Sequence, residues 1–95
     1  MTSGAWPAPT LFVAKKIEWT EQAKTDIRRI DREIALRLLQ GLARFAFTGS
    51  GDVKQLSGFD PPQFRLRVGD YRIRFRALGE GIQILRVLHR GEAFR

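Results

Sequence analysis

The sequence predicts a single α+β domain with the element order β-αα-βββ, in which two N-terminal helices pack on one face of a small, mainly antiparallel sheet. Two patterns predict this fold class. Apolar residues recur at helical spacing between residues 21 and 47, and they alternate strictly with arginine between residues 64 and 77. The length of 95 residues leaves room for one domain, so both patterns must contribute to one hydrophobic core.

The chain is expected to begin with a flexible leader over residues 1–10, where small and polar residues surround Pro7 and Pro9. The folded domain is expected over residues 11–95. It starts with residues 11–19, whose loose alternation of apolar and polar side chains predicts a first strand.

Two helices are predicted between residues 21 and 47. Thr20 is a typical N-cap residue, and Glu21 lies in the first turn, where the helix dipole favours an acid. The polar stretch 31–33 separates two sets of apolar residues and could join two helices or lie on one longer helix; we favour two. The glycine-containing segment 48–51 ends the helical region.

The remainder of the chain predicts a meander of three strands. Residues 64–68 and 71–77 alternate strictly, and Gly69-Asp70 between them is a two-residue hairpin turn. A second turn over residues 79–81 leads into residues 82–88, which are apolar on both faces and therefore predict an interior strand.

The expected hairpin register places arginines from both strands on one face. With Gly69-Asp70 as the turn, the apolar pairs are Val68 with Tyr71, Leu66 with Ile73, and Phe64 with Phe75. The opposite face then holds Arg65, Arg67, Arg72, Arg74 and Arg76. Like charges that lie directly opposite each other destabilise a sheet, so we expect an anionic ligand to compensate. The alternative is a solvated polar face that happens to use arginine.

The only histidine of the chain, His89, belongs to the last predicted strand. If Leu88 faces the core beside Tyr71, His89 lies on the side of the arginines, where it would be the one group that titrates near neutral pH. The alternative is a surface histidine at a strand end.

Composition narrows the class of function. The net charge is +7, and thirteen of the seventeen basic residues are arginine, whose planar fork suits phosphates and carboxylates. With no cysteine and one histidine, we expect neither disulfides nor a metal site, and no cofactor. No signal peptide and no membrane-spanning apolar run are evident, so a cytoplasmic protein with no membrane association is expected.

Three segments together resemble the RelE branch of the RelE/ParE toxins: residues 52–58 (DVKQLSG), 64–73 (FRLRVGDYRI) and 87–95 (VLHRGEAFR). The resemblance covers residues 11–95 and implies a RelE-like fold. It also implies a metal-independent endoribonuclease that inhibits translation by cleaving messenger RNA in the ribosomal A site, through attack of the 2′-hydroxyl on the adjacent phosphate. A co-expressed antitoxin with an acidic segment would hold such a toxin silent.

The resemblance assigns roles to residues of this chain. Its two catalytic arginines fall on Arg72 and Arg90. Expected RNA- and phosphate-binding positions are Lys54, preceding the second strand, and Arg65, Arg67, Arg74 and Phe94. This chain has arginine where the family has lysine on the second strand, and arginine is a poor general base. Phe94 replaces a tyrosine and can only stack, which leaves His89 as the candidate for proton transfer.

Two other functions remain open at this point. ParE-type relatives share the fold and poison DNA gyrase without cleaving nucleic acid. A catalytically degenerate toxin would only bind its antitoxin and, as a complex, operator DNA. Retention of both Arg72 and Arg90 favours the nuclease.

Overall fold

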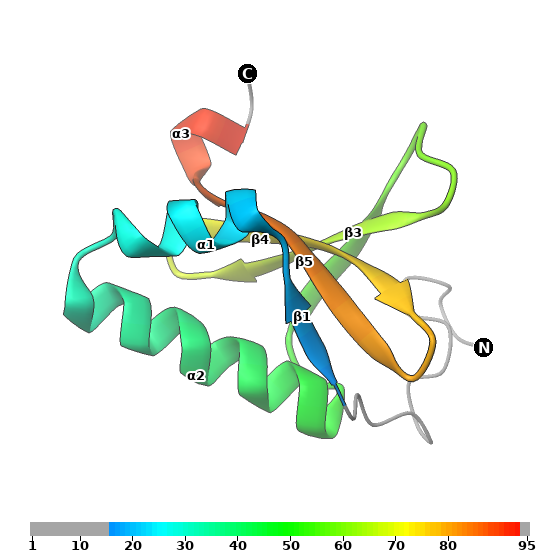
Figure 1. Cartoon of the computed structure of the whole chain (residues 1–95), viewed down its shortest axis with the longest axis horizontal. Helices are drawn as coiled ribbons and strands as arrows, with labels where there is room; N and C mark the ends of the chain where they lie inside the picture. Colours follow the sequence, from blue (N-terminus) through cyan, green and yellow to red (C-terminus); the bar gives the residue numbers. More distant parts are fainter. Residues whose placement is uncertain (1–15, 94–95) are drawn as a thin grey trace.

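The computed structural model describes residues 16–93, in which two helices lie against one face of a five-stranded sheet (Figure 1). The elements are β1 (Ile17–Trp19), α1 (Glu21–Arg28), α2 (Arg32–Thr48), β2 (Asp52–Leu56), β3 (Gln63–Val68), β4 (Tyr71–Leu78), β5 (Gly81–His89) and α3 (Arg90–Ala93). The α+β class and the division into two helices are confirmed, while β2 and α3 are additions to the predicted order. The predicted leader, residues 1–10, and Phe94 lie outside the described residues.

The strands follow the order β1-β5-β4-β3-β2 across the sheet. Strand β1 is parallel to β5, and the other neighbours are antiparallel, which confirms the mainly antiparallel sheet. Strand β5 lies between β1 and β4, as its apolar sequence predicted. Edge strand β2 escaped prediction because only Val53 and Leu56 of its five residues are half-buried and the others are exposed. Lys54 precedes β3, as expected, but lies within a strand of its own.

Both helix starts and the end of α2 have local causes in the sequence. The Thr20 hydroxyl accepts a hydrogen bond from the Ala23 amide at 3.1 Å, as an N-cap does, and donates one to the Ile84 carbonyl of β5 at 3.0 Å. The Asp31 carboxylate caps α2 by accepting from the Glu33 amide. Helix α2 ends at Gly49, which adopts the left-handed conformation with φ of 77°. The two helices are therefore separated at residues 29–31, and Arg32 and Glu33 of the polar stretch already belong to α2.

The core lies between α2 and the sheet. Buried apolar side chains of α2, among them Leu38, Leu42 and Phe45, pack with those of the strands in one cluster. The strand residues of this cluster are Phe64, Leu66, Ile73, Phe75, Ile82, Ile84 and Val87. Phe45 and Phe64 both contact the ring of Phe75, with centroids 5.3 and 5.5 Å away. The prediction that the helices cover the sheet face with the apolar hairpin residues is confirmed.

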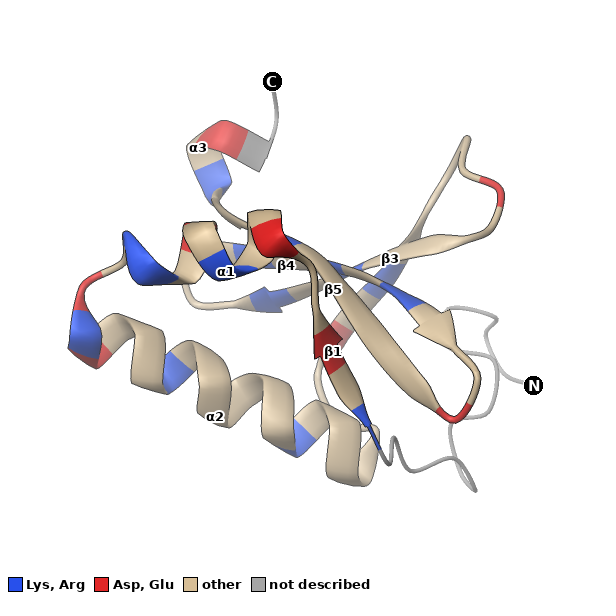
Figure 2. Cartoon of the chain, viewed as in Figure 1, with Lys and Arg blue, Asp and Glu red and all other residues tan. Residues whose placement is uncertain are grey.

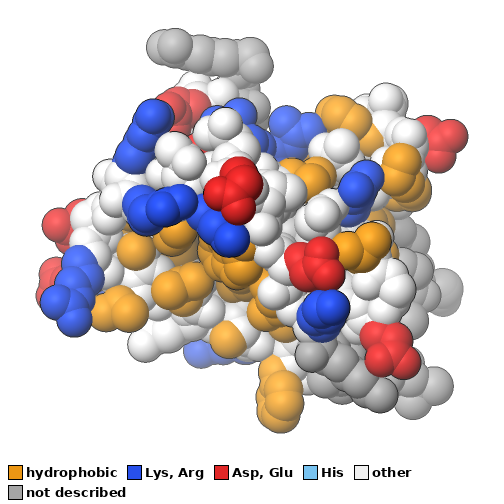
Figure 3. All heavy atoms as spheres, in the orientation of Figure 1, with side chains coloured by type: hydrophobic (Ala, Val, Ile, Leu, Met, Phe, Trp, Pro, Cys, Tyr) orange, Lys and Arg blue, Asp and Glu red, His pale blue; other side chains and the backbone are white. Residues whose placement is uncertain are grey.

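The two sides of the molecule differ in character. Figure 2 shows basic positions along β3 and β4, in the sheet layer behind the helices. On the helix side, Figure 3 shows hydrophobic side chains gathered over α2. The large hydrophobic residues of α2 that remain exposed are Ile34, Leu36, Leu39 and Phe47. None of the described helices is both long enough and apolar enough to span a bilayer.

Candidate functional site

The sheet face turned away from the helices holds the predicted set of arginines. The observed register pairs Arg67 with Arg72 and Arg65 with Arg74, as the hairpin turn predicted. Arg76 follows on β4, and we call the five residues Arg65, Arg67, Arg72, Arg74 and Arg76 the arginine face. Strand β2 extends it, because Lys54 lies opposite Arg65, and adds an acid, because Asp52 lies opposite Arg67.

Arg72 lies at the centre of the arginine face and is only 5% exposed. One guanidinium nitrogen, Nη1, donates to the backbone carbonyls of Gly69 and Tyr71 at 3.4 and 3.2 Å. Its Nε is buried, and no acceptor among the described residues bonds it. Burial lowers the pKa of Arg72, and so does repulsion from Arg67, Arg65 and Arg90. Arg72 is thus a buried cation that its surroundings destabilise.

Arg90 joins this cluster from the first position of α3. Its backbone amide donates to the Asp70 carbonyl at 2.7 Å, which holds the end of β5 beside the β3–β4 turn. The Arg90 side chain is exposed, yet its charge contributes to the lowered pKa of Arg72. The two arginines to which the resemblance assigns catalysis therefore act electrostatically on each other.

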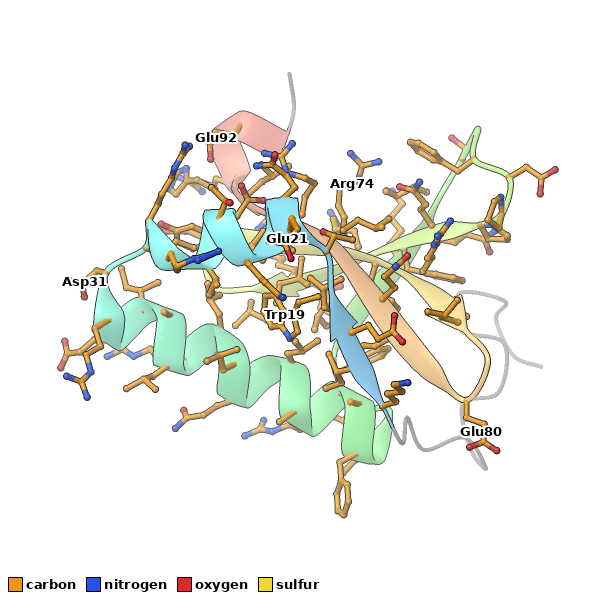
Figure 4. All side chains as sticks on the ribbon, viewed as in Figure 1. Trp19, Glu21, Asp31, Arg74, Glu80 and Glu92 are labelled. Carbon is orange, nitrogen blue, oxygen red and sulfur yellow. The ribbon has the colours of Figure 1, made fainter. Side chains whose placement is uncertain are left out.

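The two outer arginines of β4 are held by glutamines. Nη2 of Arg74 donates to Oε1 of Gln63 at 2.8 Å, and Nε of Arg76 donates to Oε1 of Gln83 at 2.7 Å. The Arg74 guanidinium also lies over the ring of Phe59, 5.0 Å from its centroid. Figure 4 shows Arg74 projecting from β4, away from the helices.

His89 does not lie on the arginine face, so the prediction that placed it there is wrong. It pairs with Tyr71, whose ring it meets edge-on at 5.3 Å, and Leu88 pairs with Arg72 instead. The physical reason is a β-bulge in β5. Phe75 pairs with Ile84 but Arg74 pairs with Arg86, so Leu85 is one extra residue and every later side chain changes face.

The His89 ring is engaged locally at the strand end. Its Nδ1 accepts a hydrogen bond from the Gly91 amide at 3.2 Å, which leaves any proton of the neutral ring on Nε2. The His89 amide donates to the Glu92 carboxylate at 3.1 Å. These contacts describe a histidine that terminates β5 and begins α3, not a group beside the arginines.

An ion pair that sequence reasoning missed holds the bulge. The Asp26 carboxylate of α1 accepts from Nε of Arg86 at 2.8 Å and from the Val87 amide at 2.9 Å, both just after the extra residue. Burial by itself raises the pKa of Asp26, but these bonds and one from Gln22 outweigh it and the pKa lies below its usual value. A single acid near the end of a short helix gave no sequence signal for this role.

The arginine face can bind and stabilise negative charge, because its arginines stay protonated near neutral pH. The five side chains of the arginine face are all arginines, which are poor general acids and bases. Among residues 16–93, no three His, Asp or Glu side chains come together as a possible metal site. The arginines of this face can therefore act on a bound anion electrostatically.

The fold and the cationic sheet face define the class of small RelE-like toxins. A chain of the RelB–RelE antitoxin–toxin complex from Methanococcus jannaschii is similar, with 25% identity and a TM-score of 0.66 over 81% of this chain and 94% of that one. A chain of the RelBE2 complex from Mycobacterium tuberculosis has 26% identity and a TM-score of 0.65, over 82% and 93%. The archaeal RelE–RelB complex from Pyrococcus horikoshii OT3 has 22% identity and a TM-score of 0.66, over 80% and 94%.

The sequence itself gives the family. Residues 17–94 match the family described as "ParE toxin of type II toxin-antitoxin system, parDE". No curated protein sequence matches the chain. This chain belongs to the RelE/ParE family and is the toxin of a type II toxin–antitoxin system.

Proposed function

We propose that this toxin binds messenger RNA on the ribosome through the arginine face and cleaves it, which inhibits translation in the cytoplasm. The observation that supports the proposal best is Arg72, a 5% exposed cation that packs among other cations with its Nε unpartnered among the described residues. A protein keeps such an arrangement at a cost in stability. A phosphate would compensate it through charge-assisted hydrogen bonds.

The reaction that fits is attack of a ribose 2′-oxygen on the adjacent phosphorus. A bond forms from the 2′-oxygen to phosphorus and the bond from phosphorus to the 5′-oxygen breaks, which leaves a 2′,3′-cyclic phosphate and a 5′-hydroxyl. The 2′-hydroxyl proton passes to solvent water, and the leaving 5′-oxygen takes a proton from solvent water. Arg72 and Arg90 would donate hydrogen bonds to the phosphate oxygens, where charge grows in the transition state. Because His89 lies on the other face, we assign this chain charge stabilisation and no proton transfer.

A protein partner belongs to the same proposal. The similar solved chains come from toxin–antitoxin complexes, and a charge of +7 suits an acidic partner. We propose that an acidic antitoxin segment covers the arginine face. We propose that the exposed apolar residues of α2 form a second contact surface for this partner. We further propose that the toxin–antitoxin complex binds operator DNA.

A second function, poisoning of DNA gyrase without cleavage, has one observation in its favour. The five residues of the arginine face are all arginines, which are poor proton-transfer groups near neutral pH. A toxin that only binds its target needs no proton-transfer group. The experiment below therefore measures both activities.

The test uses a translation extract programmed with one messenger RNA, with cleavage mapped by primer extension. The wild-type toxin should produce ribosome-dependent cuts, and Arg90→Ala should lower the cleavage rate by about a hundredfold, the typical loss for one preorganised donor to a developing oxyanion. Arg44→Ala, which removes one exposed positive charge from α2, is the matched control and should cleave normally. If the messenger RNA stays intact while supercoiling by gyrase is inhibited, the nuclease function is wrong and the chain is a gyrase poison.

A further inference from the structure

A pocket of about 290 Å³ opens at one edge of the arginine face, beside the loop that joins β2 and β3. Its walls are Leu56, Ser57, Phe59, Arg65, Arg72 and Arg74. Only the arginines among these residues were predicted from the sequence to bind anything. The pocket combines a cationic floor with an apolar and aromatic wall. These two surfaces complement the anionic phosphate and the flat base of a nucleotide.

The floor offers hydrogen-bond donors that the described residues leave unused. Nε of Arg65, of Arg72 and of Arg74 are all buried, and none has an acceptor among the described residues. Buried donors are normally bonded, so three unbonded ones in arginines that line one pocket indicate a missing acceptor beside these side chains. Arg72, which is 5% exposed, cannot turn to solvent to satisfy its Nε. An anion with several oxygens, such as a phosphate, fits this donor set.

The wall offers a flat ring. Phe59 is 41% exposed, although it is a large apolar residue in a loop. The Arg74 guanidinium covers the ring at 5.0 Å from its centroid and is itself held by Gln63 at 2.8 Å. The ring is thus positioned by the protein while a large part of it remains accessible. Gly58, with φ of 85°, supplies the left-handed turn that directs the chain into Phe59.

We propose that this pocket binds one nucleotide of the RNA, with its phosphate on the guanidinium groups of Arg65 and Arg72 and its base stacked on Phe59. The inference rests on the proposed function, because it assumes that the arginine face binds RNA. The volume is at the lower end of small-ligand pockets, roughly 300–1,000 Å³, so it admits one nucleotide and not a duplex. An acidic peptide would use the cationic floor equally well, but its carboxylates gain nothing from an exposed aromatic ring.

The test compares two RNA probes on the full chain by fluorescence anisotropy. One is a labelled single-stranded octamer with 2′-O-methyl riboses, which cannot be cleaved through the 2′-hydroxyl, and the other is the same octamer without bases. Phe59→Ala should weaken binding of the first probe by about tenfold, the usual range for loss of one base–aromatic stack. Binding of the probe without bases should not change, since its phosphates remain. Phe59→Trp should keep the wild-type affinity for both.

Phe47→Ala is the matched control, because Phe47 is 73% exposed on α2, in the layer on the opposite side of the sheet, and should affect neither probe. Equal weakening of both probes by Phe59→Ala would overturn base stacking. If Phe59→Ala leaves RNA binding unchanged but weakens binding of an acidic peptide, the pocket is a protein-docking site, and the proposal is also overturned. If Arg67→Ala and Arg90→Ala leave both probes bound as in the wild type, the RNA-binding function itself fails. If they weaken both while Phe59→Ala weakens neither, only the nucleotide pocket fails.

Discussion

The two faces of the β3–β4 hairpin come from the same fourteen-residue stretch, 64–77, and differ in almost every physical respect. Towards the helices, Leu66, Ile73 and Phe75 are at most 1% exposed and belong to the apolar core. On the other side, Arg65 and Arg74 lie opposite each other, with buried donors that no described residue satisfies. Period-two alternation thus separates a face that stabilises the fold from a face whose charges oppose it. Substitutions on the first face should therefore lower stability, and substitutions on the second face should affect binding and cleavage of RNA.

The largest expected effect is on the helix-covered face. Phe75→Ala should lower the free energy of unfolding by about 3–5 kcal/mol, because it removes the ring that packs on both Phe45 and Phe64. A domain of this size has little stability in reserve, so much of the protein should be unfolded. Urea denaturation followed by far-UV circular dichroism measures the change. A loss below about 1 kcal/mol would show that the core can collapse around the missing ring.

Next in size is the ion pair that links the two faces through the bulge. Asp26→Asn should cost about 1–3 kcal/mol, because Arg86 and the Val87 amide lose a charged acceptor. The pKa of Asp26 is lower in the folded state, so its contribution is fully present above the unfolded value of about 3.9 and is lost as the pH falls through the folded value.

Wild type and Asp26→Asn should accordingly converge in stability as the pH falls below about 4, and above that pH their difference should stay at its full value. The midpoints of urea denaturation of both proteins, measured between about pH 2.5 and 7, give this stability difference as a function of pH. A difference that stays constant over the whole range would mean that the carboxylate's charge does not matter. Gln22→Ala, which removes only the neutral bond to Asp26, serves as the weaker comparison.

The effect of Arg72→Met on the free energy of unfolding should be opposite in sign to that of Phe75→Ala. Methionine keeps the length of the side chain and removes a cation that is 5% exposed and repelled by Arg65 and Arg67. We expect stability to be unchanged or to rise by about 1 kcal/mol, as when buried ionic groups are replaced by apolar ones. RNA cleavage should be abolished in the same protein. A large loss of stability would instead make Arg72 a structural residue.

The contrast between an apolar and a charged face also explains how much of the structure the sequence could predict. Strict alternation fixed the register of β3 and β4 and hence the arginine pairs, because a slip by one residue would bury the charges. Alternation failed in β5, where Leu85 is an extra residue and the partner that holds the bulge, Asp26, is about sixty residues away in sequence. The pocket wall escaped prediction for a similar reason, since the contact of Phe59 with Arg74 depends on the loop and not on periodicity.

A smaller effect should separate exposed from buried arginines on the open face. Arg67 is exposed, so Arg67→Ala should not alter stability by more than about 0.5 kcal/mol. It should weaken RNA binding regardless of sequence and reduce the slope of log K against log salt by roughly 0.7, the value for one phosphate contact on a single strand. Anisotropy titrations at several salt concentrations provide the slope. An unchanged slope would place Arg67 outside the RNA contact.

The smallest expected effect concerns His89, which the bulge turns away from the arginine face. His89→Gln should leave the single-turnover cleavage rate and its pH dependence as in the wild type, because the ring contacts Tyr71 and the Gly91 amide and not the arginines. Glutamine can still accept from the Gly91 amide through its side-chain oxygen, so α3 should keep its place. Arg90→Ala, one residue further along, is the comparison for the cleavage rate, because it removes a positive charge that lowers the pKa of Arg72. A general acid or base would lose about a hundred- to ten-thousandfold in rate and one limb of the pH profile. That result would mean that β5 changes register when the ribosome binds, and that the bulge held by Asp26 is then released.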